Sequence, residues 1–456
     1  MTVRRRFRPL LLALFGCALV LGVVQPVAGQ LENEGGIPAL ELPALDEYQL
    51  QLDDEQRVKS GGVPHFAAVH RVEVDPWRFG EWQLEEGARA RWQLSVHSPG
   101  ALSLSLAFST FELPAGVRLW VRSTADEPGE EQQDGTREMV GPFTRADQDA
   151  HGELWTPPIT GDRLEIELDA PVAALDDITL RLSRIHHGYA GFGESDAAKA
   201  GDCHLDSACL DESWQTESRS VALLSIEGVR FCTGFLLNNT ANNGVPYLVT
   251  AHHCGVTERN AASVVVMWRH ERATCEEEAE APSRLFQTGS IWRASHRRAD
   301  ITLLELDDAP PARADVVFAG WDRADDAPLE AASIHHPNTG RKRIAFADGP
   351  LLPTRHLRDV EVAGADHLRV GHWRQGTTEG GSSGAPLFNE DRRVVGVLHG
   401  GYAACGNQDA DWFGRLATAW HGPSPERRLR DWLDPLDQQP LVLDALEPAS
   451  PAVSSD

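Results

Sequence analysis

Three short stretches of the chain carry a hydroxyl, an imidazole and a carboxylate in settings where the three groups could act together. The stretch GGSSGAPLF frames Ser382 and Ser383 with glycines. The stretch VPYLVTAHHCG ends an apolar run at His252 and His253, and RRADITLLEL begins one at Asp300. Each stretch alone is typical of an ordinary loop or strand end. Together they match acyl transfer by serine, in which an imidazole takes the hydroxyl proton and a carboxylate holds the imidazole in one tautomer.

A zinc site is the alternative chemistry for the histidine stretch. His252, His253 and Cys254 are adjacent and are all possible zinc ligands. A zinc site needs three or four ligands at characteristic spacing, and no further ligand stands at short distance in the sequence. The sequence therefore favours serine chemistry over a zinc hydrolase.

The motifs and their order resemble those of a known protease family. TAHHC resembles the TAAHC histidine motif of trypsin-like serine proteases, GSSGAP resembles their GDSGGP nucleophile motif, and the order His, Asp, Ser is theirs. Residues 203–435 resemble bacterial lysyl endopeptidases more closely, through FCTGFLLNNTANN, DITLLELDDA, IHHPNTGRKRI, TTEGGSSGAPLF, ADWFGRL and LRDWLDP in the same order. The resemblance implies a serine endopeptidase with a chymotrypsin-like double β-barrel.

The resemblance assigns one role to each residue of the set. Ser383 aligns with the nucleophile, His253 with the general base and Asp300 with the carboxylate that orients the imidazole. The backbone N–H groups of Gly381 and Ser383 would form the oxyanion hole. This chemistry needs no metal and no organic cofactor. A protease-like binding protein without activity is a further alternative, but such proteins usually lack a member of the triad, and all three are present here.

The same family resemblance predicts cleavage after lysine. A buried ammonium group needs a carboxylate partner, and ADWFGRL places Asp411 in the family's register for that partner, with Asp409 as the second candidate. His399 matches another pocket-lining position. A tryptophan that lines the pocket in the family has no evident counterpart in PTRHLRDVEVAGAD. We therefore keep arginine or dual Lys/Arg preference as alternatives to lysine.

The cysteines divide the chain into two parts. Apart from Cys17, all of them lie after residue 202, and none lies between residues 30 and 202. Six cysteines allow about 15 pairings, so the sequence alone does not choose between them. The family resemblance implies three disulfides, namely Cys203–Cys405, Cys209–Cys275 and Cys232–Cys254.

The N-terminus has the features of a secretory signal peptide. A basic segment, MTVRRRFRP, precedes the apolar run LLLALFGCALVLGVV and the small residues of QPVAGQ, so we assign residues 1–29 to the signal. Export to an oxidising compartment agrees with disulfides. A second processing site is expected in the Gly/Ala-rich stretch 188–202, where a Lys-specific enzyme could cut between Lys199 and Ala200 and release its own mature domain.

Composition limits the partners of the protein. The 456 residues include 42 basic and 68 acidic side chains, for a net charge of −26. This charge disfavours nucleic acid and anionic membranes as partners. We expect a secreted monomer that acts on protein or peptide substrates and interacts with its own propeptide.

Short strands must position these residues. Runs such as LSLSL and LEIEL alternate apolar and polar residues between residues 72 and 185, which predicts a β-sandwich-like pro-domain. Strand-like runs recur in the cysteine-bearing half, and SPERRLRDWLDPL has helical spacing near its end. We expect an all-β protein, with residues 30–62 as a loosely ordered leader. The predicted organisation is a propeptide at 30–199, a protease domain at 200–440 and a tail at 441–456.

Overall fold

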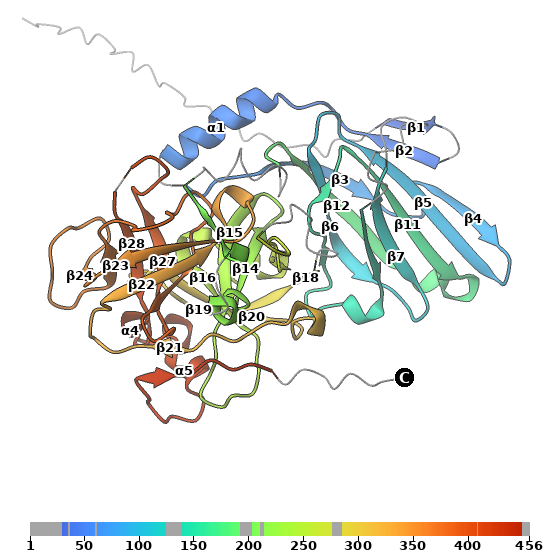
Figure 1. The fold of residues 1–456 in the computed structure, drawn as a ribbon. Coiled ribbons are helices and arrows are strands. Elements are labelled where there is room, and N and C mark those ends of the chain that lie inside the picture. The colour runs from blue at the N-terminus through green and yellow to red at the C-terminus, as the bar shows by residue number, and fades with distance from the viewer. Residues whose placement is uncertain are drawn as a thin grey trace, which may run out of the picture.

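The computed structural model of the chain describes residues 30–34, 37–59, 62–124, 138–191, 203–209, 214–275, 285–407 and 409–448. These residues form four β-sheets with few and short helices. Two sheets come from the N-terminal region and two from the cysteine-bearing region, and the two pairs lie beside each other (Figure 1). The expected signal peptide at 1–29 and the expected cleavage site at Lys199 and Ala200 lie outside the described residues.

The two N-terminal sheets pack face to face around one apolar core. In β11 (Arg163–Pro171), buried Leu164, Ile166 and Leu168 alternate with more exposed acidic residues, because successive side chains of a strand point to opposite faces. Leu104 of β6 in the other sheet belongs to the same core. The alternation that is visible in the sequence therefore produces a sandwich.

The strands of each N-terminal sheet follow a fixed order. The first sheet contains, in order, β1 (Gln30–Glu34), β2 (Ile37–Glu41), β5 (Arg89–His97), β11, β7 (Arg118–Ser123) and β8 (Met139–Phe143), with β4 (Glu81–Glu85) paired to β5. The second contains β10 (Ile159–Thr160), β6 (Ser103–Glu112), β12 (Thr179–Gly188) and β3 (Ala67–Val74), with β9 (Leu154–Trp155) paired to β6.

The prediction of a loosely ordered leader over residues 30–62 was wrong. Strand β2 pairs in parallel with β5 and buries Ala39 and Leu40 in or beside the sandwich. Residues Glu47–Lys59 form helix α1, which lies along the upper edge of the molecule in Figure 1. The helix is polar around most of its surface, so hydrophobic periodicity did not reveal it, although Glu, Gln, Leu, Lys and Arg favour helices.

Two largely antiparallel sheets build the cysteine-bearing region. The first contains, in order, β18 (Leu285–Thr288), β17 (Val265–Trp268), β14 (Val221–Ile226), β15 (Arg230–Leu236), β16 (Tyr247–Ala251), β20 (Ile301–Leu306) and β19 (Ser290–His296). The second contains β13 (Leu205–Asp206), β23 (Arg343–Asp348), β22 (Glu330–His335), β26 (Pro386–Asn389), β27 (Val394–Gly401), β28 (Asp411–Arg415), β25 (His367–Val370) and β24 (Leu352–Thr354). The all-β, chymotrypsin-like prediction is confirmed.

A shared core joins these two sheets. Phe235 and Val249 of the first sheet and Ile334 and Phe388 of the second belong to one buried apolar cluster. Each sheet also has an apolar core of its own. The loops between the sheets are thereby held in fixed positions, which is the requirement for a catalytic set drawn from both.

Among the described residues, the helices of this region are single turns. They are α3 (Gln215–Ser218), α4 (Leu416–Ala419), α5 (Arg430–Leu433) and the 3₁₀ turns η3 (Ser207–Cys209), η5 (His252–Cys254), η6 (Ala261–Ser263), η7 (Ala312–Ala314), η8 (Pro337–Thr339) and η9 (Pro425–Arg427), while η1 (Arg145–Asp147) and η2 (Val172–Asp177) belong to the N-terminal region. The expected C-terminal helix is therefore the short α5. Among the described residues, no helix has the length and apolar character needed to cross a bilayer.

Part of the expected tail pairs with the protease sheets. Strand β29 (Val442–Leu443) pairs with β21 (Trp321–Asp322), and Leu446 forms a bridge with Phe318. Residues 449–456 lie outside the described residues.

Candidate active site

Strand pairing brings the histidine and the aspartate together. His253 lies on η5 directly after β16, and Asp300 directly precedes β20. Because β16 and β20 are paired with Ala251 opposite Ile301, the two side chains emerge at the same sheet edge. Nδ1 of His253 lies 2.6 Å from Oδ2 of Asp300, and the backbone N–H of His253 donates to Oδ1 at 2.9 Å.

The third group comes from the loop before β26. Oγ of Ser383 lies 2.9 Å from Nε2 of His253. Asp300 is 2% exposed, so its carboxylate has little access to water and accepts a hydrogen bond from Nδ1–H of His253. That bond leaves the Nε2 lone pair facing the serine hydroxyl, which is the arrangement a general base needs.

Two glycines allow the serine loop its shape. Gly381 has φ +89° and Gly384 has φ +88°, both in the left-handed region that side chains disfavour. A Cβ at Gly381 would collide with the ring of Phe231, and one at Gly384 would collide with the carbonyl oxygen of Thr233. Gly381 and Gly384 are therefore required by both backbone conformation and close packing.

The same loop leaves two backbone donors free. Within the described part of the chain, the N–H groups of Gly381 and Ser383 donate to no protein acceptor, whereas those of Ser382, Gly384 and Ala385 do. Free N–H groups beside a nucleophile can stabilise the negative charge that develops on a carbonyl oxygen under attack. These two N–H groups are therefore available for the oxyanion hole that the sequence predicts.

The neighbouring serine points into the protein. Ser382 is 0% exposed, and its Oγ lies 2.8 Å from Nδ1 of His335. His336 is also fully buried, and its backbone N–H donates to Oγ of Thr233, which in turn donates to the carbonyl of Gly381. His335 and His336 thus pack behind the loop that carries Ser383.

Asp411 lies in a fully enclosed setting. It is 1% exposed, and its Oδ2 accepts hydrogen bonds from Nε1 of Trp373 and Oγ1 of Thr378, both at 2.7 Å. Burial raises the pKa of Asp411, and the donors from Thr378, Trp373 and the backbone of Ala403 oppose that rise. Asp409 is exposed, whereas Asp411 is buried. The two candidates for the carboxylate that would pair with a substrate lysine therefore differ in burial.

His399 belongs to a layer of imidazoles beside Asp300. Its Nε2 lies 3.6 Å from Oδ2 of Asp300, and its ring stacks on that of His253 with centroids 5.4 Å apart. The ring of His356 also stacks on that of His399, with centroids 3.5 Å apart, and Nε2 of His367 lies 3.0 Å from Nδ1 of His399. Within the described residues, His399 makes no hydrogen bond to Asp411.

Burial disfavours the charged forms of His399 and His356. It lowers the pKa of His399 to about 3 and that of His356 to about 4, with Asp300 opposing the shift in both cases. His356, His367 and Trp373 were not singled out from the sequence. His356 belongs to PTRHLRDVEVAGAD, the segment in which the sequence shows no evident counterpart of the family tryptophan. Its ring stacks on that of His399.

Three disulfides tie the loops around this site. The pairs are Cys203–Cys405, Cys209–Cys275 and Cys232–Cys254, the same three that the family resemblance implies. Cys254 follows His253 directly, and its partner Cys232 lies on β15. The histidine turn is therefore linked covalently to the neighbouring strand.

The structure does not support the zinc alternative for the histidine pair. Nδ1 of His252 lies 2.7 Å from Oγ of Ser295, and Cys254 is bound in a disulfide. A second grouping with ligand-like distances consists of the contacting pair His253 and Asp300 and the neighbouring His399. Its atoms already take part in the hydrogen bonds and stacking described above.

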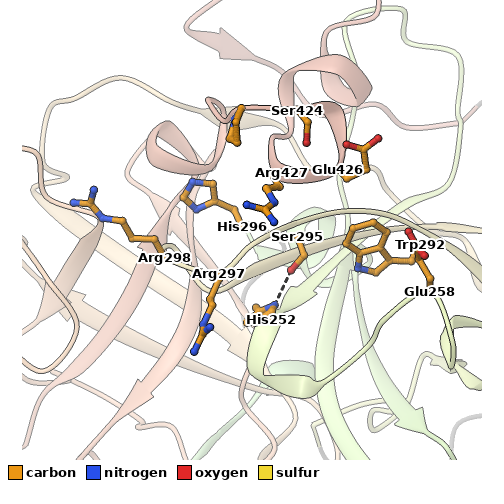
Figure 2. A pocket seen from close by; sticks show the side chains of 11 residues that line it. His252, Glu258, Trp292, Ser295, His296, Arg297, Arg298, Ser424, Glu426 and Arg427 are labelled. Atoms are coloured by element: carbon orange, nitrogen blue, oxygen red, sulfur yellow. Dashed lines mark hydrogen bonds between the residues drawn. The ribbon is translucent and has the colours of Figure 1, made fainter.

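A cavity of about 810 Å³ opens behind the histidine turn. Figure 2 shows His252 bonded to Ser295 at its wall, with Trp292, Glu258 and Arg427 around it. Apart from His252, which only neighbours His253, no residue proposed from the sequence lines this cavity. It lies apart from the hydroxyl of Ser383.

Two family models match the chain in sequence. The model described as "Lysyl endopeptidase N-terminal domain" matches residues 68–189, and "Lysyl endopeptidase, C-terminal domain" matches residues 197–414. The chain belongs to the lysyl endopeptidase family. A lysyl endopeptidase from Pseudomonas aeruginosa is 30% identical over 292 residues, which cover 57% of this chain and 60% of that protein. The match thus spans less than two thirds of the length of the Pseudomonas protein.

Solved structures with distant similarity also include proteases. The Rv3671c protease from M. tuberculosis in its active form is 14% identical, with a TM-score of 0.29 over 47% of this chain and 86% of that one. The HtrA-type protease AlgW with a tripeptide is 13% identical, with a TM-score of 0.29 over 44% of this chain and 58% of that one. A similarity at this TM-score establishes neither fold nor activity.

Proposed function

We propose that this member of the lysyl endopeptidase family is a secreted serine endopeptidase that cleaves peptide bonds on the carboxyl side of lysine. The observation that carries the proposal is the continuous contact from Ser383 through His253 to Asp300, with distances of 2.9 and 2.6 Å. These contacts join a nucleophile, a base and an orienting carboxylate. Family membership supports the same reaction.

The residues act in sequence during one turnover. Oγ of Ser383 attacks the scissile carbonyl while Nε2 of His253 takes the hydroxyl proton, and Asp300 stabilises the imidazolium that forms. The N–H groups of Gly381 and Ser383 bind the developing oxyanion. His253 then gives the proton to the leaving amine, and water hydrolyses the acyl-enzyme by the reverse roles. No step requires a metal or an organic cofactor.

Asp411 is the residue proposed to select a basic side chain. A lysine ammonium removed from water needs a nearby carboxylate, and the enclosed Asp411 supplies one at the edge of the sheet that also carries His399. Since a guanidinium group can also pair with a carboxylate, arginine or dual Lys/Arg preference stays the alternative for the substrate.

The N-terminal region is proposed to be a propeptide. In this proposal residues 1–29 are removed on export, residues 30–199 assist folding or maintain latency, and cleavage between Lys199 and Ala200 releases the protease domain at 200–440 with its tail. The absence of cysteines from 30–202 and the separate apolar core of the sandwich support this division. The substrates would be proteins or peptides, and the released propeptide would be a partner.

Substitution of the two adjacent serines tests the proposal. We expect Ser383→Ala to abolish hydrolysis of lysyl p-nitroanilide and labelling by a serine-directed fluorophosphonate. Ser382→Ala should keep the nucleophile, because Ser382 Oγ points to His335 instead of His253. Absence of labelling in the unmodified protein would favour the alternative of a protease-like binding protein without activity.

A further inference from the structure

A short segment of the N-terminal region lies against the protease sheet that carries the histidine turn. His65 forms an antiparallel bridge with Arg230 at the start of β15, and the N–H of Phe66 donates to the carbonyl of Val229 at 2.9 Å. Pro64 lies next to Gly380, where a Cβ on the glycine would be 3.6 Å from the proline ring. The segment 63–66 therefore contacts both β15 and the nucleophile loop.

The direction of this segment is that of the leaving half of a peptide substrate. Along β15 the chain advances toward Thr233, whose N–H donates to the carbonyl of Ser383 at 2.8 Å. Because the bridge between His65 and Arg230 is antiparallel, segment 63–66 runs away from Ser383 as its residue numbers rise. A substrate whose lysine side chain points to Asp411 would continue past Ser383 in the same chain direction as segment 63–66.

The side chain of Phe66 fills an apolar site on the outside of this sheet. It is 1% exposed and packs in one cluster with Leu223, Phe231 and Met267. The rings of Phe66 and Phe231 meet edge to face, with centroids 6.3 Å apart. The ring of Phe231 also abuts Gly381, so this apolar site adjoins the proposed oxyanion hole.

Release of the N-terminal region would uncover this site. Leu223 and Met267 are paired neighbours on β14 and β17, and Phe66 covers them together with Phe231. An uncovered apolar patch beside a free strand edge is suited to an extended peptide that adds main-chain hydrogen bonds and inserts one bulky side chain.

We propose that the surface formed by Leu223, Phe231, Met267 and the start of β15 is a substrate subsite for a bulky apolar residue on the carboxyl side of the scissile bond. The N-terminal segment 63–66 occupies this subsite before maturation and withholds it from substrates. This inference rests on the proposed endopeptidase function. It adds a second determinant of specificity, on the protease sheet opposite the one that carries Asp411.

Internally quenched peptides test the subsite in protease processed from the full-length chain. Each peptide carries one lysine, and alanine is replaced by phenylalanine at the second, third or fourth position after it. We expect kcat/KM to rise about tenfold for one of the three phenylalanine peptides, the size expected when a Phe side chain is removed from water. Lysyl p-nitroanilide, which has no residues beyond the scissile bond, reports the proposed function separately.

Two comparisons identify the surface. Phe231→Ala should reduce the ratio of kcat/KM for the preferred phenylalanine peptide over its alanine counterpart to about one. The synthetic peptide VPHFAAV, which matches residues 63–69 and has no lysine or arginine, should inhibit cleavage of the phenylalanine peptide. The control peptide VPHAAAV should inhibit at least about fivefold more weakly.

The outcomes separate the two proposals. Equal kcat/KM for all phenylalanine and alanine peptides, with normal hydrolysis of lysyl p-nitroanilide, would overturn the subsite and leave the proposed function intact. A phenylalanine preference that persists in Phe231→Ala would also overturn it. Loss of hydrolysis of every lysyl substrate would overturn the proposed function and the subsite with it.

Discussion

Nε1 of Trp373 donates a hydrogen bond to Oδ2 of Asp411 at 2.7 Å. Thr378 supplies a second donor to the same oxygen, and the backbone of Ala403 also donates to the carboxylate. Burial raises the pKa of Asp411, and these donors favour its charged form. The charge that would attract a lysine ammonium therefore depends on the indole as well as on the carboxylate.

We expect Trp373→Phe to move the acidic limb of the pH profile upward. Loss of the indole donor raises the pKa of Asp411 further, and the carboxylate loses its charge as pH falls through that pKa. kcat/KM for a lysyl substrate should fall at higher pH than in the unmodified protein, mainly through KM. The measurement is kcat/KM between pH 4 and 9. An unchanged acidic limb would contradict the role given to Trp373.

Asp411→Asn provides the control for that experiment. The amide keeps the size of the side chain and removes its charge, so cleavage after lysine should fall by about 10²-fold or more at every pH. The acidic limb assigned to Asp411 should vanish from the residual activity. Undiminished cleavage after lysine would remove Asp411 from the specificity site.

The sequence was informative where chemistry is local. The flexible frame of GGSSGAP and the apolar strand before His253 each indicated a position for one reactive side chain, and alternating runs such as LEIEL indicated strands. The structure brings Ser383, His253 and Asp300 into contact through strand pairing. The order of the motifs resembles that of a known family, and this resemblance predicted that His253 and Ser383, which are 130 positions apart, act together.

Features that arise from packing across the fold were not predictable. His356 and His367 flank His399 only because β25 and the loop before it lie beside β27 through β28. Helix α1 lacks the apolar stripe that marks most surface helices, so the sequence predicts a loosely ordered leader there instead of a helix. Contacts of this kind depend on tertiary neighbours that no local pattern encodes.

Asp300→Asn should reduce kcat by about 10⁴-fold, the effect known for the equivalent change in a related triad. The amide would present a hydrogen-bond donor or acceptor to Nδ1 of His253 without the charge that stabilises the imidazolium. Burst kinetics with an active-site titrant would measure the rate of acylation. Folding should be checked by thermal unfolding, since Asp300 also binds the backbone of His253.

Gly381→Ala should damage the oxyanion hole while leaving the triad residues unchanged. The new Cβ would collide with Phe231 at a backbone φ of +89°, so the loop must shift and carry its N–H groups with it. We expect kcat to fall about 10²- to 10³-fold. Gly406→Ala is the matched control, because Gly406 has the same φ and no atom within 4 Å of its Cβ position. Equal losses in both variants would indicate backbone strain alone.

Lys199→Gln should block or slow release of the protease domain. If the enzyme cuts after lysine, the bond between Lys199 and Ala200 is available for self-processing, and glutamine removes the required charge. N-terminal mass spectrometry of the secreted protein should give a mature terminus at Ala200. A mature terminus that follows a non-basic residue in the unmodified protein would contradict self-processing at this site.

We expect the contact between the N-terminal region and the protease region to depend on pH through Asp307. Its carboxylate faces Asp149 of the N-terminal region, its Oδ2 lacks a hydrogen-bond partner among the described residues, and His151 stands 4.0 Å away. Burial, then the charge of Asp149, raises the pKa of Asp307 to about 6 from 3.8, with smaller effects from His151, Asp308 and Glu305.

The raised pKa means that protonated Asp307 favours the docked state. This contribution is fully present below about pH 4 and is lost as pH rises through about 6, so docking should weaken between pH 4 and 7. In full-length Ser383→Ala protein, limited proteolysis should cut the N-terminal region faster at pH 7.5 than at pH 5. Asp307→Asn should remove most of that difference, and Asp308→Asn should preserve most of it, because the exposed Asp308 has only a small effect on the pKa of Asp307. A difference that survives Asp307→Asn would assign the pH dependence to another group.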